Sequence, residues 1–246
     1  ACSAGPAFEG AGVKDGMRAT EGAIEDVWIN RETYEAEYRV IGGGQPQGIC
    51  GSGLLSLLAE LFLSGIVDKA GNIQTNLNTT RVREGEHGSE YIIARKEDTV
   101  TGKDIVITHV DIDNLLRAKA AIYAGYEILA QSVGIPLDMV EQFLVGGSFG
   151  KYINVEKAIE IGLFPDMDWK KIKYLGNTSL RGAYLALLDK SSREQICQIA
   201  NRMTYVELSA DNSFYEAFMS AMFLPHTNLT NFPTIKQKME KIKKTA

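Results

Sequence analysis

The sequence predicts an α/β fold, because short apolar runs alternate with helical patterns along its second half. The runs 140–145 and 172–175 are both followed by glycine, and helix patterns then begin at Val155 and at Ser179. Strand, glycine turn and helix in this order are typical of α/β layers. With 246 residues, 45% of them hydrophobic and 23% charged, the chain can bury a sizeable core as one large domain or two small ones.

The first half is predicted to contain short strands, turns and one apolar helix. It is rich in glycine up to Pro46, after which an apolar helix pattern begins with Ser52 as its N-cap and stops at Gly65. The following segment is polar and rich in turn residues. Its alternating runs 91–93 and 105–108 predict strands of a hairpin or an inserted subdomain.

Two further helices are predicted around the first apolar run of the second half. A long helix runs from Asp113 to about Val133, with apolar residues at helical spacing, and Gly134 and Pro136 end it. A short helix begins at Val155 with Asn154 as its N-cap.

Charge and hydropathy exclude several classes of partner. The 31 acidic residues outnumber 26 Lys and Arg residues, which gives a net charge of −5. Because binding to nucleic acid needs a basic face, no nucleic-acid partner is expected. The dense basic stretch 236–244 is interpreted as a solvated helix face. The most apolar run, 53–67, is short for a bilayer and contains polar residues, so no membrane anchor is expected.

The cysteines predict neither a metal site nor a disulfide framework. Cys2, Cys50 and Cys197 stand far apart without C-x-x-C spacing, and the three histidines are equally scattered. A zinc site or an internal iron–sulfur cluster needs clustered ligands. Sparse cysteines fit a reducing compartment, so a cytoplasmic location is expected.

The strongest local motif is the segment 143–150, FLVGGSFG. A buried strand that ends in Gly146 and Gly147 lets backbone N–H groups approach an anion, since no Cβ stands in the way. The segment is not a Walker A loop, because Tyr152 follows the Gly-Lys pair, and it lacks the G-x-G-x-x-G spacing of dinucleotide-binding folds. Two alternatives remain: a turn that only needs positive φ, and the nucleophile elbow of a serine hydrolase with Ser148 as the nucleophile.

Three segments in order resemble the actin, sugar-kinase and heat-shock-chaperone ATPase superfamily, which has a ribonuclease-H-like fold. The strand 139–150 resembles its adenosine motif, the segment 180–184 its connecting helix, and the long helix around 117–120 the helix that lines adenine. The resemblance implies an actin-like ATPase fold, here as one lobe plus family-specific insertions.

A closer resemblance covers nearly the whole chain. The segments that carry it are GPAFEG at 5–10, GMRA at 16–19, GAI at 22–24, GICGSGL at 48–54, AKAAI at 118–122, GGSFG at 146–150 and FLPH at 223–226. They are similar to the reductive activators of corrinoid-dependent methyltransferases and O-demethylases of anaerobes. This resemblance implies an ATP-hydrolysing domain that couples ATP to reduction of cobalt(II) to cobalt(I) in a corrinoid protein.

The chain departs from that family in two respects. Such activators carry an N-terminal [2Fe–2S] domain, for which this chain lacks the four clustered cysteines, and the superfamily's Asp-x-Gly-Thr phosphate motifs are absent. Residues 1–246 are therefore expected to be the C-terminal actin-like ATPase domain of a longer protein. A docking or dimerisation module that binds nucleotide weakly, with a possible homodimer, is the alternative.

The resemblance also implies which residues hold ATP and Mg²⁺. Gly146, Gly147 and Ser148 would lie against the nucleotide. The ammonium of Lys119 would meet ribose or phosphate oxygens while Ile122 packs against the base. The free N–H groups of Gly51 and Ser52, at a helix N-terminus, form an anion site, although capping explains them equally well. No catalytic carboxylate can be assigned.

Overall fold

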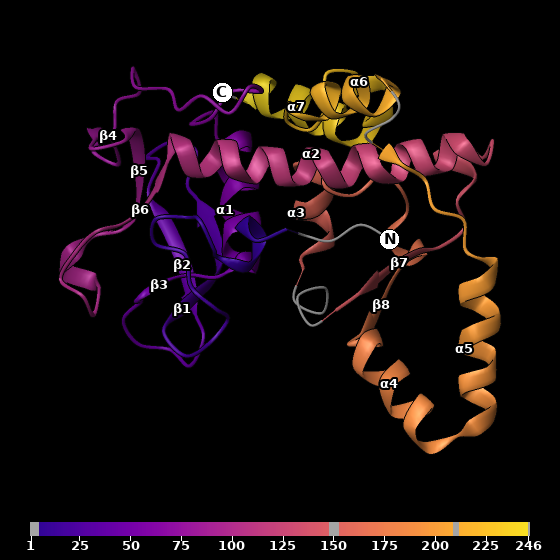
Figure 1. Cartoon of the computed structure of the whole chain (residues 1–246). Helices are drawn as coiled ribbons and strands as arrows, with labels where there is room; N and C mark the ends of the chain where they lie inside the picture. The colour runs from indigo at the N-terminus through magenta and orange to yellow at the C-terminus, as the bar shows by residue number, and fades with distance from the viewer. Residues whose placement is uncertain (1–4, 148–152, 209–211, 246) are drawn as a thin grey trace.

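The computed structural model describes residues 5–147, 153–208 and 212–245. Its longest element is the helix α2 (His109–Ser132), along which the other elements are arranged (Figure 1). Before it come β1 (Ala23–Ile29), β2 (Ala36–Val40), β3 (Gly48–Ile49), α1 (Gly51–Leu63), β4 (Val82–Gly85), β5 (Gly88–Ala94) and β6 (Ile105–Thr108). After it come β7 (Phe143–Gly146), α3 (Val155–Glu160), β8 (Ile172–Gly176), α4 (Thr178–Leu188), α5 (Lys190–Arg202), α6 (Asn212–Ala221) and α7 (Pro233–Thr245).

The predicted apolar helix is α1, and it packs directly on β1. β1 pairs antiparallel with β2 and parallel with β3. A Cβ on Gly53 would lie 2.3 Å from the carbonyl oxygen of Ile24, so only glycine allows the helix to approach this strand so closely. Gly65 follows the helix with φ of 76°, as predicted for its C-terminal end.

The predicted N-cap of α1 is wrong. Cys50, not Ser52, occupies the N-cap position, and Ser52 lies within the first turn. Cys50 connects the helix to the strand that precedes it, because its N–H donates to the carbonyl of Ile24 while its own carbonyl accepts from the N–H of Leu54. The start of the helix is thus set by pairing with β1 rather than by a side-chain cap.

The two predicted runs lie in β5 and β6, which pair antiparallel, and β4, a strand that was not predicted, pairs antiparallel with β5. Polar contacts fasten this sheet and α2 to the N-terminal segment. The ammonium of Lys14 donates to Glu90 over 3.1 Å, and its backbone N–H donates to Asp111 over 3.0 Å. The carboxylate of Asp15 accepts from the N–H of Val106 over 2.8 Å.

α2 begins four residues earlier than predicted, because a reciprocal cap starts it. The hydroxyl of Thr108 accepts from the N–H of Asp111, and the carboxylate of Asp111 accepts from the N–H of Thr108. This satisfies two donors that the helix would otherwise leave free. The spacing of Thr108 and Asp111 is the sequence signal that could have located this start.

The second half combines a parallel strand pair with helices on its flanks. β7 and β8 are parallel, and α3 begins after Asn154, whose side chain accepts from the N–H of Lys157 as an N-cap. These elements confirm the predicted alternation of strands and helices. α6 packs along α2, and α7 follows it (Figure 1).

α4 and α5 differ from the other helices because none of their residues is buried. In Figure 1 they extend away from the rest of the molecule. Their large exposed apolar residues are Leu180, Tyr184, Leu185, Leu187, Leu188, Ile196 and Ile199. Such a concentration of exposed apolar side chains is typical of a surface that another polypeptide covers.

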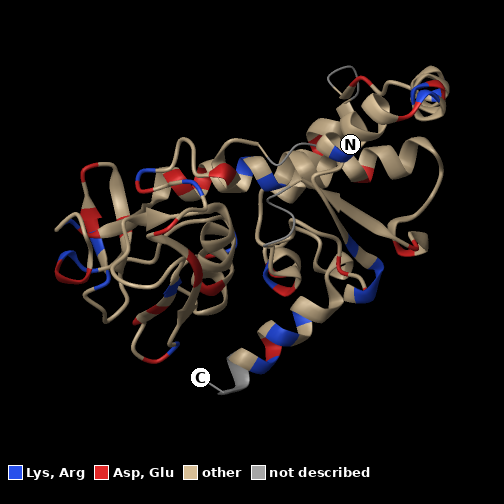
Figure 2. Ribbon diagram, turned by 90° about the horizontal axis from the view of Figure 1, so that it is seen from below, with Lys and Arg blue, Asp and Glu red and all other residues tan. Residues whose placement is uncertain are grey.

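Acidic and basic residues both occur along the whole chain. Figure 2 shows Lys and Arg interspersed with Asp and Glu along the ribbon, whereas the C-terminal helix α7 is predominantly basic, with Glu240 as its one acidic residue. Among the described residues, no helix combines the length and apolar character needed to cross a bilayer.

Candidate functional site at the glycine edge of β7 and β8

Two parallel strands end in glycine at the same edge of their sheet. Gly146 of β7 is paired with Gly176 of β8, next to a register shift between Val145 and Gly146. The N–H of Gly147 donates to the carbonyl of Gly176 over 2.7 Å. Ligands of α/β proteins bind outside the carboxyl ends of parallel strands, which is where these glycines lie.

Glycine keeps this edge open for a ligand. Gly147 has φ of 96° and Gly176 has φ of 69°, conformations that other residues rarely adopt. A Cβ on either residue would meet no described atom within 4 Å, whereas a Cβ on Gly146 would lie 2.9 Å from the hydroxyl of Thr178. No described atom therefore crowds the backbone of Gly147, which is what a close approach of a ligand would require. We call Gly146, Gly147 and Gly176 the glycine edge.

The N-terminus of α4 adjoins the glycine edge. Asn177 caps the helix by accepting from the N–H of Leu180 over 2.9 Å. Within the described ranges, the N–H groups of Thr178 and Ser179 have no acceptor. Free N–H groups at a helix N-terminus favour an anion such as phosphate. The signal for this contribution was present in the sequence as the Gly-Asn-Thr turn before the helix.

Ser148 lies outside the described residues, as does the rest of the segment 148–152, so its role remains a prediction. Among the described residues, Gly147 directly follows β7 and Ile153 precedes α3. The hydroxyl of Tyr174 on β8 donates to the carbonyl of Ile153 over 2.9 Å, and partial burial raises the pKa of Tyr174. This hydrogen bond connects the residue before the N-cap of α3 to β8.

Gly51 and Ser52 are not part of the same strand pair. They form the first turn of α1, beside the sheet of β1 to β3. The thiol of Cys50 donates to the carbonyl of Ile24 over 3.3 Å, and the hydroxyl of Ser52 lies 3.3 Å from this sulfur. An anion site at these residues stays a prediction.

Lys119 is fully buried and holds the C-terminal segment on α2. Its ammonium donates to the carbonyls of Phe223 and Pro225 over 2.6 and 2.7 Å. Burial lowers the pKa of Lys119 well below its ordinary value. The ammonium of Lys119 is neither exposed to solvent nor open to the approach of a phosphate. Its contact with a nucleotide therefore stays a prediction. Ile122, three residues on, is half-buried and packs against the core.

His226 lies beside Lys119 and packs against Tyr123. Its ring centroid is 5.1 Å from that of Tyr123, and its Nδ1 accepts from the N–H of Asn228 over 3.0 Å. Burial, with a smaller effect of Lys119, lowers the pKa of His226 to about 4. The imidazole of His226 is therefore neutral at physiological pH. Its contacts with Tyr123 and Asn228 fit a structural role.

This depressed pKa predicts that stability falls in mild acid. In the unfolded chain His226 binds a proton below about pH 6.5, whereas in the folded chain it does so only below about pH 4. Stability present above pH 6.5 is therefore lost between pH 6.5 and 4, by roughly 3 kcal/mol. Urea unfolding of wild type and His226→Gln at several pH values between 4 and 6.5 measures how the free energy of unfolding depends on pH. The same slope in both proteins would contradict the assignment to His226.

Divalent metal needs few protein ligands when phosphates supply the others. In the described part of the chain, no group of three or more His, Cys, Asp or Glu side chains is placed to hold a metal ion. Mg²⁺ that accompanies ATP is commonly bound by one or two carboxylates, water and the phosphates themselves. The free space and N–H groups of the glycine edge fit a nucleotide, and its Mg²⁺ would be carried mainly by the phosphates.

Three known proteins are similar to this chain in structure or sequence. A solved structure of a reductive activator for corrinoid, iron-sulfur protein has a TM-score of 0.89 and 49% identity, and the match covers 95% of this chain and 37% of that one. The corrinoid activation enzyme RamQ of Eubacterium limosum is 39% identical over 223 residues, 87% of this chain and 37% of RamQ. The [Co(II) methylated amine-specific corrinoid protein] reductase of Methanosarcina barkeri is 28% identical over 222 residues, 82% of this chain and 37% of that protein.

The chain thus spans 37% of the length of each of these relatives. A family model described as the C-terminal domain of RACo, the ASKHA domain, matches residues 1–236. ASKHA domains are actin-like ATPase domains, so the predicted fold class and the resemblance to reductive activators are confirmed. The chain belongs to the family of RACo C-terminal ASKHA domains.

Proposed function

We propose that the chain is the ATP-binding and ATP-hydrolysing part of a protein that reductively activates a corrinoid protein. The glycine edge carries the proposal, since it places open backbone and the N-terminus of α4 together at the carboxyl ends of two parallel strands. The relatives' descriptions as corrinoid activators support the choice of partner.

The proposed reaction couples two balanced steps. Water attacks the γ-phosphorus of ATP, the bond between this phosphorus and the bridging oxygen breaks, and ADP and phosphate leave. One electron from an external donor reduces cobalt(II) of the corrinoid to cobalt(I). Nucleotide binding supports the reduction if it favours the conformation that binds the reduced corrinoid protein more tightly, because a ligand shifts an equilibrium by its differential affinity for two states.

The electron donor is proposed to lie in another part of a longer polypeptide. This chain covers 37% of its relatives, and the exposed apolar side chains of α4 and α5 are suited to being covered by further polypeptide. A [2Fe–2S] cluster needs several cysteines close together, and the two described cysteines of this chain lie on different elements. Cys50 is buried beside Ile24, whereas Cys197 is exposed on α5. The cluster is therefore proposed for that further part. The whole protein is proposed to act in the cytoplasm.

ATP binding tests the proposal. We expect the 246-residue chain to hydrolyse ATP poorly and the full-length protein to bind a non-hydrolysable ATP analogue in calorimetry. The reason is that phosphates in this superfamily are clamped between two lobes, whereas the described chain provides the glycine edge alone. Robust turnover by the 246 residues would show that the phosphate-binding groups lie within this chain. Failure of the full-length protein to bind ATP would refute the proposed function.

The exposed surface of α4 and α5 favours a second candidate function. None of the residues of these two helices is buried, although both carry large apolar side chains. In this alternative the domain mainly docks a partner or a second copy and binds nucleotide weakly. Sedimentation of the full-length protein with and without nucleotide separates the two, because a docking module would associate equally in both conditions.

A further inference from the structure

The parallel pair of β7 and β8 is an incomplete sheet. Among the described residues, no third strand pairs with β7 or β8, so each of them has one free edge. Parallel sheets are almost always covered on both faces, and two strands alone are marginally stable in water. The pair therefore indicates that further polypeptide takes part in this sheet.

One face of the pair is packed against the rest of the chain. The ring centroid of Phe143 on β7 lies 5.4 Å from that of Tyr126 on α2 and 5.2 Å from that of Phe164. Ile172 on β8 is opposite Phe143 in the register and is also buried. These side chains attach the pair to α2 and to the loop that follows α3.

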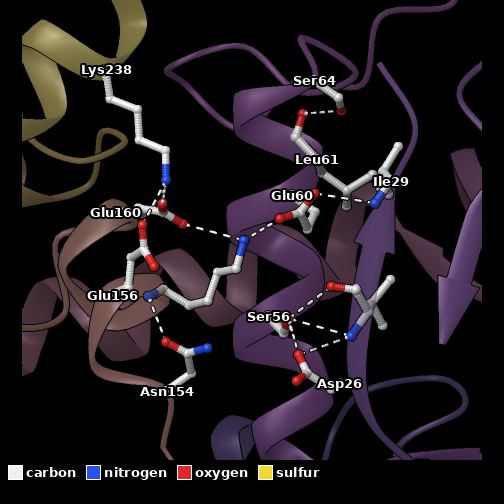
Figure 3. Close-up of polar contacts among 12 residues, drawn as sticks. Asp26, Ile29, Ser56, Glu60, Leu61, Ser64, Asn154, Glu156, Glu160 and Lys238 are labelled. Carbon is white, nitrogen blue, oxygen red and sulfur yellow. Dashed lines mark hydrogen bonds and ion pairs between the residues drawn. The ribbon is translucent and has the colours of Figure 1, made fainter. Parts of the chain in front are cut away.

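Charges hold α3, the helix that connects β7 to β8, in place. Lys157 on α3 pairs with Glu60 of α1, and Lys238 of α7 pairs with Glu160 of α3 (Figure 3). The connection between the two strands is thus fixed to two other helices. Further polypeptide can therefore join the pair at its free edges and on its opposite face.

The opposite face of the pair is apolar and open. Successive side chains of a strand point to opposite faces, so Leu144 points away from the face that carries Phe143. Leu144 is 55% exposed, Leu175 of β8 is 44% exposed, and α4, which follows β8, has no buried residue. Exposed apolar side chains on adjoining elements are typical of a surface that another polypeptide covers.

The first described residues lie close to β7. A Cβ on Gly5 would be 3.8 Å from the Cβ of Ala118 on α2, and Phe8 is fully buried. From Ala118 to Tyr126, which contacts Phe143 of β7, the distance along the helix is about 12 Å at 1.5 Å per residue. An extended strand spans that distance with about four residues. Polypeptide that precedes Gly5 can therefore reach β7 within a few residues.

The relatives contain enough polypeptide for this role. The chain spans 37% of the length of each relative and matches a family model described as a C-terminal domain, so most of their length precedes the matching part. A segment of the same polypeptide that begins so close to β7 has a high effective concentration at its edge. This favours the preceding segment over a second copy of the chain as the occupant.

We infer that the polypeptide preceding Gly5 in the full-length protein adds a strand to the free edge of β7 and covers the face that carries Leu144. The glycine edge then lies at the carboxyl end of an interior strand, in a sheet of at least three strands. The inference deepens the proposed function and rests on it for the longer polypeptide. Its test needs no nucleotide, because it concerns how the sheet is assembled.

Amide-resolved hydrogen exchange tests the strand addition. In a strand that is paired along one edge, alternate amides bond to the partner strand and the others exchange freely. We expect at least every second amide of residues 143–146 to exchange fast in the 246-residue chain. In the full-length protein all of them should be protected, with the fast amides slowed at least about tenfold. Amides of β5, which is paired along both edges, should exchange equally in both proteins.

A matched pair of substitutions tests the covered face. Leu144 is 55% exposed, and Val100, between β5 and β6, is 58% exposed. In the 246-residue chain, Leu144→Lys and Val100→Lys should both leave the urea midpoint unchanged, since both side chains face water. In the full-length protein, Leu144→Lys should speed exchange at residues 143–146 at least about tenfold, because a charge is then buried, and Val100→Lys should not. Leu144→Met stays apolar and should retain the protection of wild type.

The outcomes separate this inference from the proposed function. Equal exchange at residues 143–146 in the two wild-type proteins would overturn the inference, as would equal effects of Leu144→Lys and Val100→Lys in the full-length protein. Protection that rises with the concentration of the 246-residue chain would assign the free edge to a second copy instead. If the full-length protein binds no ATP analogue, the proposed function fails, and the exchange experiment still decides whether a strand is added.

Discussion

Replacing Gly147 by valine is expected to abolish nucleotide binding by the full-length protein. Gly147 has φ of 96° and no described atom within 4 Å of an added Cβ, so a branched side chain would strain this conformation and block the approach of the proposed nucleotide. Ser148→Ala is expected to cost at most about 0.5 to 1.5 kcal/mol of binding free energy, the contribution of one hydrogen bond. Calorimetry with a non-hydrolysable ATP analogue measures both.

Gly134→Val is the matched control for backbone strain. Gly134 follows α2 with φ of 68°, and a Cβ there would also meet nothing within 4 Å. Its valine variant should therefore bear similar strain while binding nucleotide like wild type. The serine-hydrolase interpretation makes the opposite prediction: Ser148→Ala would remove all esterase activity, because a covalent step needs its attacking oxygen. Fluorophosphonate labelling at Ser148, with nucleotide binding unaffected by Gly147→Val, would establish the hydrolase instead.

Lys119→Met should lower the free energy of unfolding by about 2 to 4 kcal/mol, because it leaves the carbonyls of Phe223 and Pro225 without their donor. Methionine is of similar length and apolar, so little packing is lost. Urea denaturation measures the change, and hydrogen exchange should show it concentrated in residues 221–235.

Arg117→Met on the same helix is the control for the Lys119 substitution. Arg117 is 63% exposed and pairs with Asp113 one turn away, so its loss should cost less than about 0.5 kcal/mol. Equal stability of Lys119→Met and wild type would mean that the two buried hydrogen bonds contribute nothing. A stable Lys119→Met protein that has lost nucleotide affinity would instead support the predicted contact with ribose or phosphate.

The sequence predicted those parts of the fold that depend on neighbouring residues. The cap of α3 by Asn154, the end of α1 at Gly65 and the antiparallel pairing of β5 with β6 follow from local hydrogen bonds and hydrophobic periodicity. The end of β7 at the glycine edge was also predictable from neighbouring residues. Gly146 and Gly147 were identified because strand, glycine and helix follow one another directly along the chain.

The parts that were missed depend on residues far apart in the sequence. Lys119 has the pattern of an ordinary helix-surface lysine, and its acceptors lie 104 and 106 residues later. Glu60 on α1 pairs with Lys157 on α3, which lies 97 residues later in the sequence. Cys50 replaces Ser52 as the N-cap of α1 because β1 holds its backbone. A single sequence contains no local signal for such pairings, so tertiary packing decided each of them.

The anchoring of the C-terminal segment by Lys119 also sets an order of events during synthesis. A ribosome adds about 5 to 20 residues per second, so Phe223 is made about 5 to 20 seconds after Lys119. During that interval α2 exists without the carbonyls that will accept from its buried ammonium, and this ammonium must stay hydrated. The nascent α2 therefore keeps one side open until residues 221–235 emerge, and the arrival of this segment covers the buried ammonium of Lys119.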